Sequence, residues 1–218
     1  MDNVSGSVRL FMSSHRTVLE GLGSWFAIVT AVVLARTFQN EAVFRDDGIL
    51  LLGNDPFNYW TQVGDLVTVA DGPLDLHAFV SFQARDPLFV VTLGWITEAL
   101  GGTPNVVAVV LALYPLVAAI LTVLAIYWVA RLLTGNHWTS LVVAAVLAIL
   151  PAHALRSTVG FADHHAFDQL WIALTMVVLV WLVTTDRPLR SASPWIGSVV
   201  LSIGIAAQVL SWIGGVLY

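Results

Sequence analysis

The sequence predicts an all-α integral membrane protein with several membrane-spanning helices. Hydrophobic residues make up 58% of the 218 residues, charged residues make up only 11%, and the mean hydropathy is +0.84. A water-soluble domain cannot bury that much apolar surface, so part of the chain must face lipid. The nine tryptophans agree with this, because tryptophan favours the membrane interface. The sequence has no cysteine, which excludes disulfides and thiolate chemistry.

Five apolar stretches approach the length of about 20 residues that a helix needs to cross the hydrocarbon core. They are approximately Val18–Phe38, Val106–Ala130, Trp138–Ala152, Gln169–Thr185 and Trp195–Tyr218. Pro115 in the second stretch predicts a kink. We interpret the first stretch as an uncleaved anchor, because no small-residue cleavage pattern follows it. The fifth stretch still reads as a span at its last residue, so we expect residues 1–218 to be the N-terminal part of a longer transmembrane domain.

A long polar segment, residues 39–105, separates the first two apolar stretches. Its apolar part, Pro87–Gly101, is too short to span a membrane comfortably. We interpret it as a helix that lies along the membrane surface. The alternative is a short sixth span, which would place Asp163 on the opposite side of the membrane from Asp55.

The placement of charge predicts the orientation in the membrane. All nine basic residues are arginines, and with the N-terminus inside, five of them lie on the cytoplasmic side. Eleven of the fourteen acidic residues then lie outside. This makes residues 39–105 a long first external loop. The net charge of −5 argues against a nucleic-acid partner.

Two acidic motifs lie on the predicted external side. The first is Gly-Asn-Asp-Pro-Phe at residues 53–57, which contains Asp55, and the second is residues 156–168, which contains Asp163 and two adjacent histidines. Carboxylates bind Mg²⁺ and Mn²⁺, and Mn²⁺ also accepts imidazole. If the two loops approach each other, Asp55 and Asp163 form a divalent metal site. We expect His165 to complete it, because a residue two positions on can converge in a loop while the immediate neighbour points away.

Each of these residues also has a purely structural interpretation. Asp163 could cap a helix N-terminus by accepting hydrogen bonds from free backbone N–H groups. Asp55 could be an Asx-turn residue before Pro56. Arg156 could extend to the membrane interface or pair with a substrate phosphate. The sequence leaves these alternatives open, and it does not fix the direction of the Arg85-Asp86-Pro87 group in the long loop.

Together, the two motifs resemble the catalytic subunit of oligosaccharyltransferases in its archaeal form. The resemblance rests on Gly-Asn-Asp-Pro-Phe at 53–57 in the first external loop, and on Arg156, Gly160 and Asp163-His164-His165 in the second. Their order, spacing and sidedness agree across nearly the whole chain. The resemblance implies a multi-span membrane domain of the GT-C glycosyltransferase type. The family's soluble external domain, its acceptor-reading Trp-Trp-Asp-Tyr-Gly motif and a later metal-engaging glutamate are absent from residues 1–218.

The resemblance implies transfer of an oligosaccharide from a polyprenyl (dolichyl) phosphate or pyrophosphate carrier to asparagine in Asn-X-Ser/Thr sequences. Asp55 and Asp163 would be catalytic metal ligands, and His165 a variant third ligand for Mn²⁺ or Mg²⁺. Arg156 and His164 are weaker candidates, for substrate binding, and His164 is expected to be a bystander at the metal. The implied partners are a lipid-linked donor, an acceptor polypeptide and the membrane, with the active site on the external face of the cell membrane.

Two other functions remain possible on the sequence alone. Another GT-C enzyme, such as a protein O-mannosyltransferase, would share an acidic first external loop but would commonly work without a metal. A secondary transporter could use Asp163 and the histidines as a proton relay. The transporter is disfavoured, because its ionisable residues are expected in mid-span and here they lie mostly in loops. Inverted repeats are also not visible.

Overall fold

The computed structural model describes residues 23–185 and 191–211. Helices predominate in this part of the chain. In order they are Gly23–Leu34, α2 (Asn40–Val43), α3 (Asp55–Val69), α4 (Leu76–Ser81), α5 (Pro87–Ala99), α6 (Pro104–Thr134), α7 (His137–Ile149), α8 (Pro151–Arg156), α9 (His164–Thr184) and α10 (Ala192–Ser211). Strands β1 (Phe44–Arg45) and β2 (Gly48–Ile49) form a short antiparallel hairpin that pairs Phe44 with Ile49.

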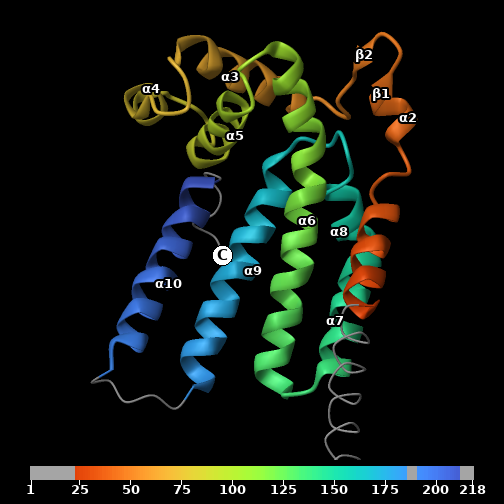
Figure 1. Cartoon of the computed structure of the whole chain (residues 1–218), viewed down its shortest axis with the longest axis vertical. Coiled ribbons are helices and arrows are strands. Elements are labelled where there is room, and N and C mark those ends of the chain that lie inside the picture. Colours follow the sequence, from red (N-terminus) through yellow and green to blue (C-terminus); the bar gives the residue numbers. More distant parts are fainter. Residues whose placement is uncertain (1–22, 186–190, 212–218) are drawn as a thin grey trace, which may run out of the picture.

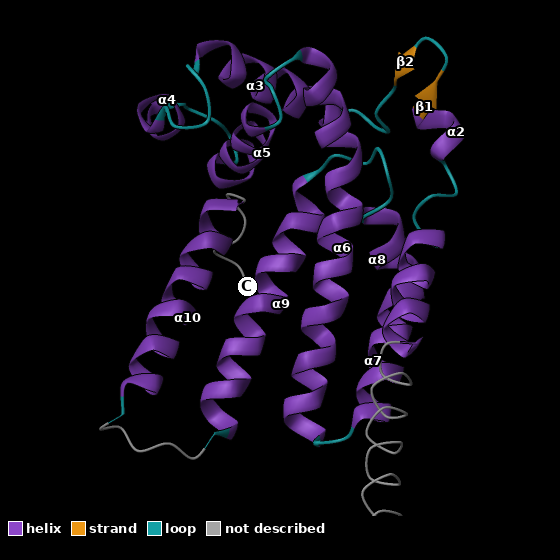
Figure 2. Ribbon diagram, viewed as in Figure 1, coloured by secondary structure: helices purple, strands orange, loops and turns teal. Residues whose placement is uncertain are grey.

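The long helices run side by side, and the short elements gather at one end of them. Figure 1 shows α10, α9, α6 and α7 along the long axis, with α3, α4, α5 and the hairpin above them. Figure 2 shows the same separation between long helices and a cap of short helices and loops. Helix α9 packs against both α6 and α10, and α6 packs against α7. Both acidic motifs lie at the capped end of this bundle.

Within the described residues, three helices are long and apolar enough to cross a membrane, namely α6, α9 and α10. Helix Gly23–Leu34, α5 and α7 are apolar but shorter. Residues 18–22 of the first predicted span and 212–218 of the fifth lie outside the described residues. The helix predicted near Pro87 within residues 39–105 is present as α5. It begins at Pro87 and packs against α3.

Helix boundaries differ from the predicted spans at several ends, and a specific residue explains two of these differences. Helix α7 ends at Ile149, and Pro151 starts the separate helix α8. Proline has no N–H and forces the residue before it out of the helical region, which explains why Leu150 has ψ 119°. Helix α9 begins at His164, five residues before the predicted Gln169, because Asp163 caps its N-terminus.

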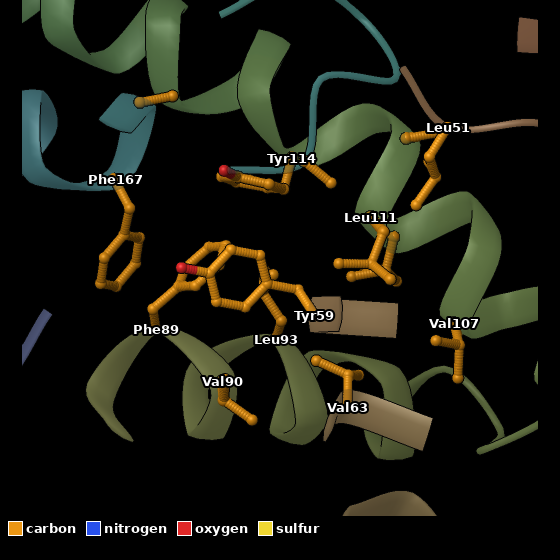
Figure 3. Packing of buried hydrophobic residues seen from close by; sticks show 14 of the residues in the cluster. Leu51, Tyr59, Val63, Phe89, Val90, Leu93, Val107, Leu111, Tyr114 and Phe167 are labelled. Carbon is orange, nitrogen blue, oxygen red and sulfur yellow. The ribbon is translucent and has the colours of Figure 1, made fainter. Parts of the chain in front are cut away.

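An apolar core joins the short helices to the bundle. Tyr59 of α3, Phe89 of α5, Tyr114 of α6 and Phe167 of α9 meet in it, as Figure 3 shows. The rings of Tyr59 and Phe89 pack edge to face, with centroids 4.8 Å apart and an interplanar angle of 86°. This is a preferred aromatic arrangement. The core therefore fixes the start of α3 relative to the start of α9, the two places where the acidic motifs lie.

Arg36 ties the end of the first helix to the second motif loop. Its guanidinium is fully buried and bonds to neutral groups: Ser157 Oγ at 2.9 Å, the carbonyl of Ala148 at 2.8 Å, the carbonyl of Val32 at 3.2 Å and His153 Nδ1. The Ala148 carbonyl lies at the end of α7, where the break before α8 deprives carbonyls of helical partners. Arg36 thus donates hydrogen bonds at the point where helix α7 ends and a carbonyl loses its helical partner.

Candidate metal centre

The two acidic motifs, 108 residues apart at Asp55 and Asp163, are brought together by backbone contacts. The N–H of Leu52 donates to the carbonyl of Gly160 at 2.8 Å. A Cβ placed on Gly53 would lie 3.6 Å from the ring of Phe161. The approach that the sequence analysis required is therefore present in the structure.

Gly160 makes this approach possible. Its φ of +82° is a conformation that favours glycine, and a Cβ there would lie 2.5 Å from Val43 Cγ2. Its N–H donates to the carbonyl of Ala112 in α6 at 2.9 Å. A residue with a Cβ at this position would clash with Val43 and would hold a strained backbone conformation.

Asp163 is at the centre of the site and is only 2% exposed. Its Oδ1 accepts a hydrogen bond from the backbone N–H of His164 at 2.7 Å, so the capping role considered from the sequence is present. Its Oδ2 is directed elsewhere and lies 3.4 Å from His165 Nε2. The hydroxyl of Tyr114 donates to the Asp163 backbone carbonyl. Capping therefore uses one carboxylate oxygen and leaves the other for a ligand.

Asp163, His164 and His165 have ligand atoms that all lie within 4.8 Å of one another, close enough to hold a metal ion. The two histidines differ in surroundings. The His165 side chain is 37% exposed, whereas the His164 side chain is 9% exposed and directed into the protein. The structure thus adds His164 to the group from which the sequence analysis excluded it, although its burial leaves little room for substrate contact.

Asp55 lies in the first turn of α3 and is exposed. Its carboxylate is close enough to interact electrostatically with the imidazole of His165. Among the described residues, no hydrogen bond engages this carboxylate, so it is not committed to an Asx turn. Asp55 is not one of the three residues whose ligand atoms lie within 4.8 Å of one another, but its charge acts on His165, the exposed histidine of that group.

Burial and hydrogen bonding act against each other on Asp163. Burial favours the neutral acid, but hydrogen bonding to His164 and the charges of His164 and His165 outweigh it. The pKa of the Asp163 carboxyl is therefore lower than its usual value. A carboxylate that stays ionised while almost fully buried favours cation binding.

Arg156 lies beside this group at the C-terminal end of α8. Its guanidinium carbon is 5.7 Å from the centre of the Phe161 ring, a cation–π distance. It lines a hollow of about 350 Å³ together with Gln39, Leu155, Thr158 and Phe161. Its charge also acts on His165. A cation next to the carboxylates is suited to an anionic substrate group.

The sequence analysis missed Tyr59 beneath the site, and it left the direction of Asp86 open. Tyr59 and Asp86 are buried, and the Tyr59 hydroxyl donates to Asp86 Oδ2 at 2.5 Å. The same hydroxyl lies 3.0 Å from His164 Nδ1, and Asp168 Oδ2 lies 3.9 Å from His164 Nε2. One signal was present in the sequence, because Tyr59 follows Asp55 by four residues and so shares its face of the helix.

The donor set fits a divalent cation. Carboxylate oxygens suit hard ions such as Mg²⁺, and an added imidazole suits transition ions such as Mn²⁺. Asp163 supplies one buried ionised carboxylate and His165 supplies one half-exposed imidazole, while the exposed carboxylate of Asp55 acts on His165 through its charge. This chemistry is what a cation site at a protein surface needs.

A family model described as "Oligosaccharyl transferase STT3, N-terminal" matches residues 80–218 of the chain. Among curated proteins, dolichyl-phosphooligosaccharide-protein glycotransferase 2 of Archaeoglobus fulgidus is 24% identical over 199 residues, covering 89% of this chain and 31% of the relative. The glycotransferase AglB of Haloferax volcanii, named for a dolichyl-monophosphooligosaccharide donor, is 26% identical over 215 residues, covering 87% and 20%. The chain thus spans a third or less of the length of these relatives.

Solved structures show the same fold. The oligosaccharyltransferase of Archaeoglobus fulgidus in complex with Zn and sulfate matches with a TM-score of 0.75 at 21% identity, over 89% of this chain and 25% of that one. AglB of the same organism, in complex with an inhibitory peptide and a dolichol-phosphate, matches with a TM-score of 0.75 at 21% identity, over 90% and 24%. The arrangement of helices described above is therefore that of the corresponding part of these proteins.

Proposed function

The chain belongs to the oligosaccharyl transferase STT3 family, and we propose from this membership that it is part of a membrane-bound oligosaccharyltransferase. The reaction proposed is transfer of an oligosaccharide from a polyprenyl phosphate or pyrophosphate, of the dolichyl type, to the asparagine of an Asn-X-Ser/Thr sequence. The observation that carries the proposal is the group of ligand atoms from Asp163, His164 and His165, with the charge of Asp55 acting on His165, in a chain of this family. The fold proposed for the complete membrane domain is of the GT-C type.

The roles proposed for the site residues follow from the chemistry of the reaction. The acceptor amide nitrogen is a poor nucleophile, and the departing group is an anionic lipid phosphate. Asp55, Asp163 and His165 would hold a divalent cation, Mn²⁺ or Mg²⁺, which supplies Lewis-acid stabilisation of negative charge. Arg156, at the adjoining hollow, would bind the carrier phosphate through its guanidinium.

The site would lie on the external face of a multi-pass membrane protein. The donor is polar at the glycan and apolar at the carrier, so a site at the membrane surface can meet both parts. In the structure the motif loops and the helices α3, α4 and α5 gather at one end of the bundle. The loop between α6 and α7 lies at the other end. These two ends should therefore face opposite sides of the membrane.

Single-cysteine labelling tests this orientation. Ser81→Cys in α4 and Thr134→Cys at the end of α6 each replace an exposed hydroxyl by a thiol in a chain that has no native cysteine. An impermeant maleimide added to intact cells should label position 81 and spare position 134 until the cells are opened. Labelling of 134 and not 81 would contradict the orientation.

The proposed function is tested by glycan transfer with the full-length protein. Purified protein in detergent is given a lipid-linked oligosaccharide and a peptide containing Asn-X-Thr, with a matched Gln-X-Thr peptide as control. Glycopeptide should form from the asparagine peptide alone. Transfer to the hydroxyl of serine or threonine in both peptides would instead indicate an O-glycosyltransferase and would sink the proposal.

A further inference from the structure

A buried polar chain runs beneath the proposed cation site. It leads from Asp86 through Tyr59 to His164, and from His164 to Asp163. Asp86, Tyr59, His164 and Asp163 are all buried, with exposed fractions of 0%, 2%, 7% and 2%. Buried polar groups are costly unless they are paired, so a chain of this kind needs a reason.

The hydrogen bonds assign a direction to the protons of this chain. The Tyr59 hydroxyl donates to Asp86 Oδ2 at 2.5 Å. The Tyr59 oxygen then accepts, and the partner 3.0 Å away is His164 Nδ1. His164 therefore carries a proton on Nδ1, and because Asp163 Oδ1 lies 2.7 Å from the same nitrogen, this single N–H is shared between the Tyr59 oxygen and Asp163 Oδ1.

Asp163 Oδ1 is occupied twice as a result. It accepts from the backbone N–H of His164 at 2.7 Å and lies 2.7 Å from His164 Nδ1. Its other oxygen, Oδ2, points toward His165 Nε2. Two donors on one oxygen fix the carboxylate plane, so that the second oxygen is directed at the exposed side of the group.

The polar groups of Asp86 and Tyr59 are not explained by another role. Asp86 is the N-cap residue of α5 but makes no capping hydrogen bond with its side chain. Tyr59 is held by Phe89, which itself packs against Tyr114 and Phe167. Figure 3 shows the Tyr59 ring inside this aromatic group. The hydroxyl position is therefore fixed by packing, as an orienting group requires.

We propose that Asp86 and Tyr59 are positioning residues for the cation site, acting through His164 on the orientation of Asp163. They touch neither the cation nor the substrate. Outer-shell partners of this kind typically change metal affinity by about 10- to 100-fold. The proposal rests on the cation site of the proposed function, but metal affinity can be measured without glycan donor or acceptor.

The test is Mn²⁺ binding by the full-length protein after EDTA stripping, measured by calorimetry. Tyr59→Phe keeps the ring and removes the hydroxyl, and should weaken Mn²⁺ binding by about 10- to 100-fold. Tyr127→Phe is the matched control. Tyr127 is also buried, and its hydroxyl lies 2.9 Å from Nδ1 of His137, a histidine that does not belong to the site. The control should bind Mn²⁺ as wild type does.

A second background shows whether Tyr59 acts through the histidine. In His164→Ala protein, adding Tyr59→Phe should cause no further loss of Mn²⁺ affinity, because the intermediary is already absent. A structural role of Tyr59 would lower affinity in both backgrounds alike, and this result would overturn the proposal. So would wild-type affinity in Tyr59→Phe.

Asp86→Leu provides the same test if Tyr59→Phe fails to fold. Without its acceptor, the Tyr59 hydroxyl should turn its proton to His164 Nδ1, which moves the imidazole proton to Nε2 and removes the donor to Asp163. Mn²⁺ binding should then weaken as in Tyr59→Phe, and wild-type affinity would overturn the proposal. If glycan transfer is absent but the Mn²⁺ affinities are as predicted, the proposed function is rejected and this inference stands. If the protein transfers glycan but binds no Mn²⁺, this inference is rejected and the transferase activity stands.

Discussion

Asp163→Asn should abolish most glycan transfer while leaving the protein folded. Asparagine caps a helix N-terminus about as well as aspartate, so the start of α9 should be retained. What is lost is the negative charge that would hold the cation. Lewis-acid stabilisation is worth several kcal/mol, so the rate should fall by about 100- to 1,000-fold. Peptide glycosylation and thermal unfolding of the full-length variant measure the two effects.

Asp47→Asn is the control for this substitution. Asp47 is an exposed acid in the turn between β1 and β2, and it should keep both activity and stability. Wild-type transfer by Asp163→Asn would mean that the residue serves as a helix cap alone. Because Asn preserves capping, the experiment separates the two interpretations that the sequence left open.

Arg36→Met should cause the largest loss of stability. The change removes the donors for Ser157 Oγ, His153 Nδ1 and the Ala148 carbonyl, in surroundings that water does not reach. Each buried polar group left unpaired costs about 1–3 kcal/mol, and two or three such groups give about 3–5 kcal/mol. Equilibrium unfolding in detergent micelles by SDS or heat measures the change.

Arg45→Met is the matched control. Arg45 is exposed and makes one described hydrogen bond, to the carbonyl of Ala42 at 3.0 Å. Its replacement should change stability by less than about 0.5 kcal/mol, as expected for surface positions. If Arg36→Met is as stable as Arg45→Met, the buried guanidinium does not hold the first helix to α8.

The membrane character and the two motifs were predictable because they are local in sequence. Long apolar runs identify α6, and the two acidic motifs can be read directly from residues 53–57 and 156–168. Hydropathy could not find the start of α9, because a cap depends on one side chain and the histidines after it are polar. Hydropathy also missed the end of α7, because the apolar residues continue through Pro151 although the helix ends at Ile149.

The groups that support the site were not predictable, because each depends on contacts between distant segments. Asp86 meets Tyr59 across 27 residues, and Tyr59 meets His164 across 105. Arg36 reaches Ser157 across 121 residues. A single sequence gives the residue types but not these pairings. His164 shows the consequence, since its role depends on which side of α9 faces α3.

The cation dependence of glycan transfer tests the central claim most directly. Full-length protein is stripped with EDTA, and transfer to an Asn-X-Thr peptide is titrated with Mn²⁺ and with Mg²⁺, for wild type and for His165→Asp. Transfer should stop on stripping and return with either ion, with Mn²⁺ more effective in wild type, because imidazole favours the transition ion. The all-carboxylate set of His165→Asp should shift the preference towards Mg²⁺. Transfer that survives EDTA, or a Mn²⁺ to Mg²⁺ activity ratio equal in both proteins, would contradict a cation site built from Asp55, Asp163 and His165.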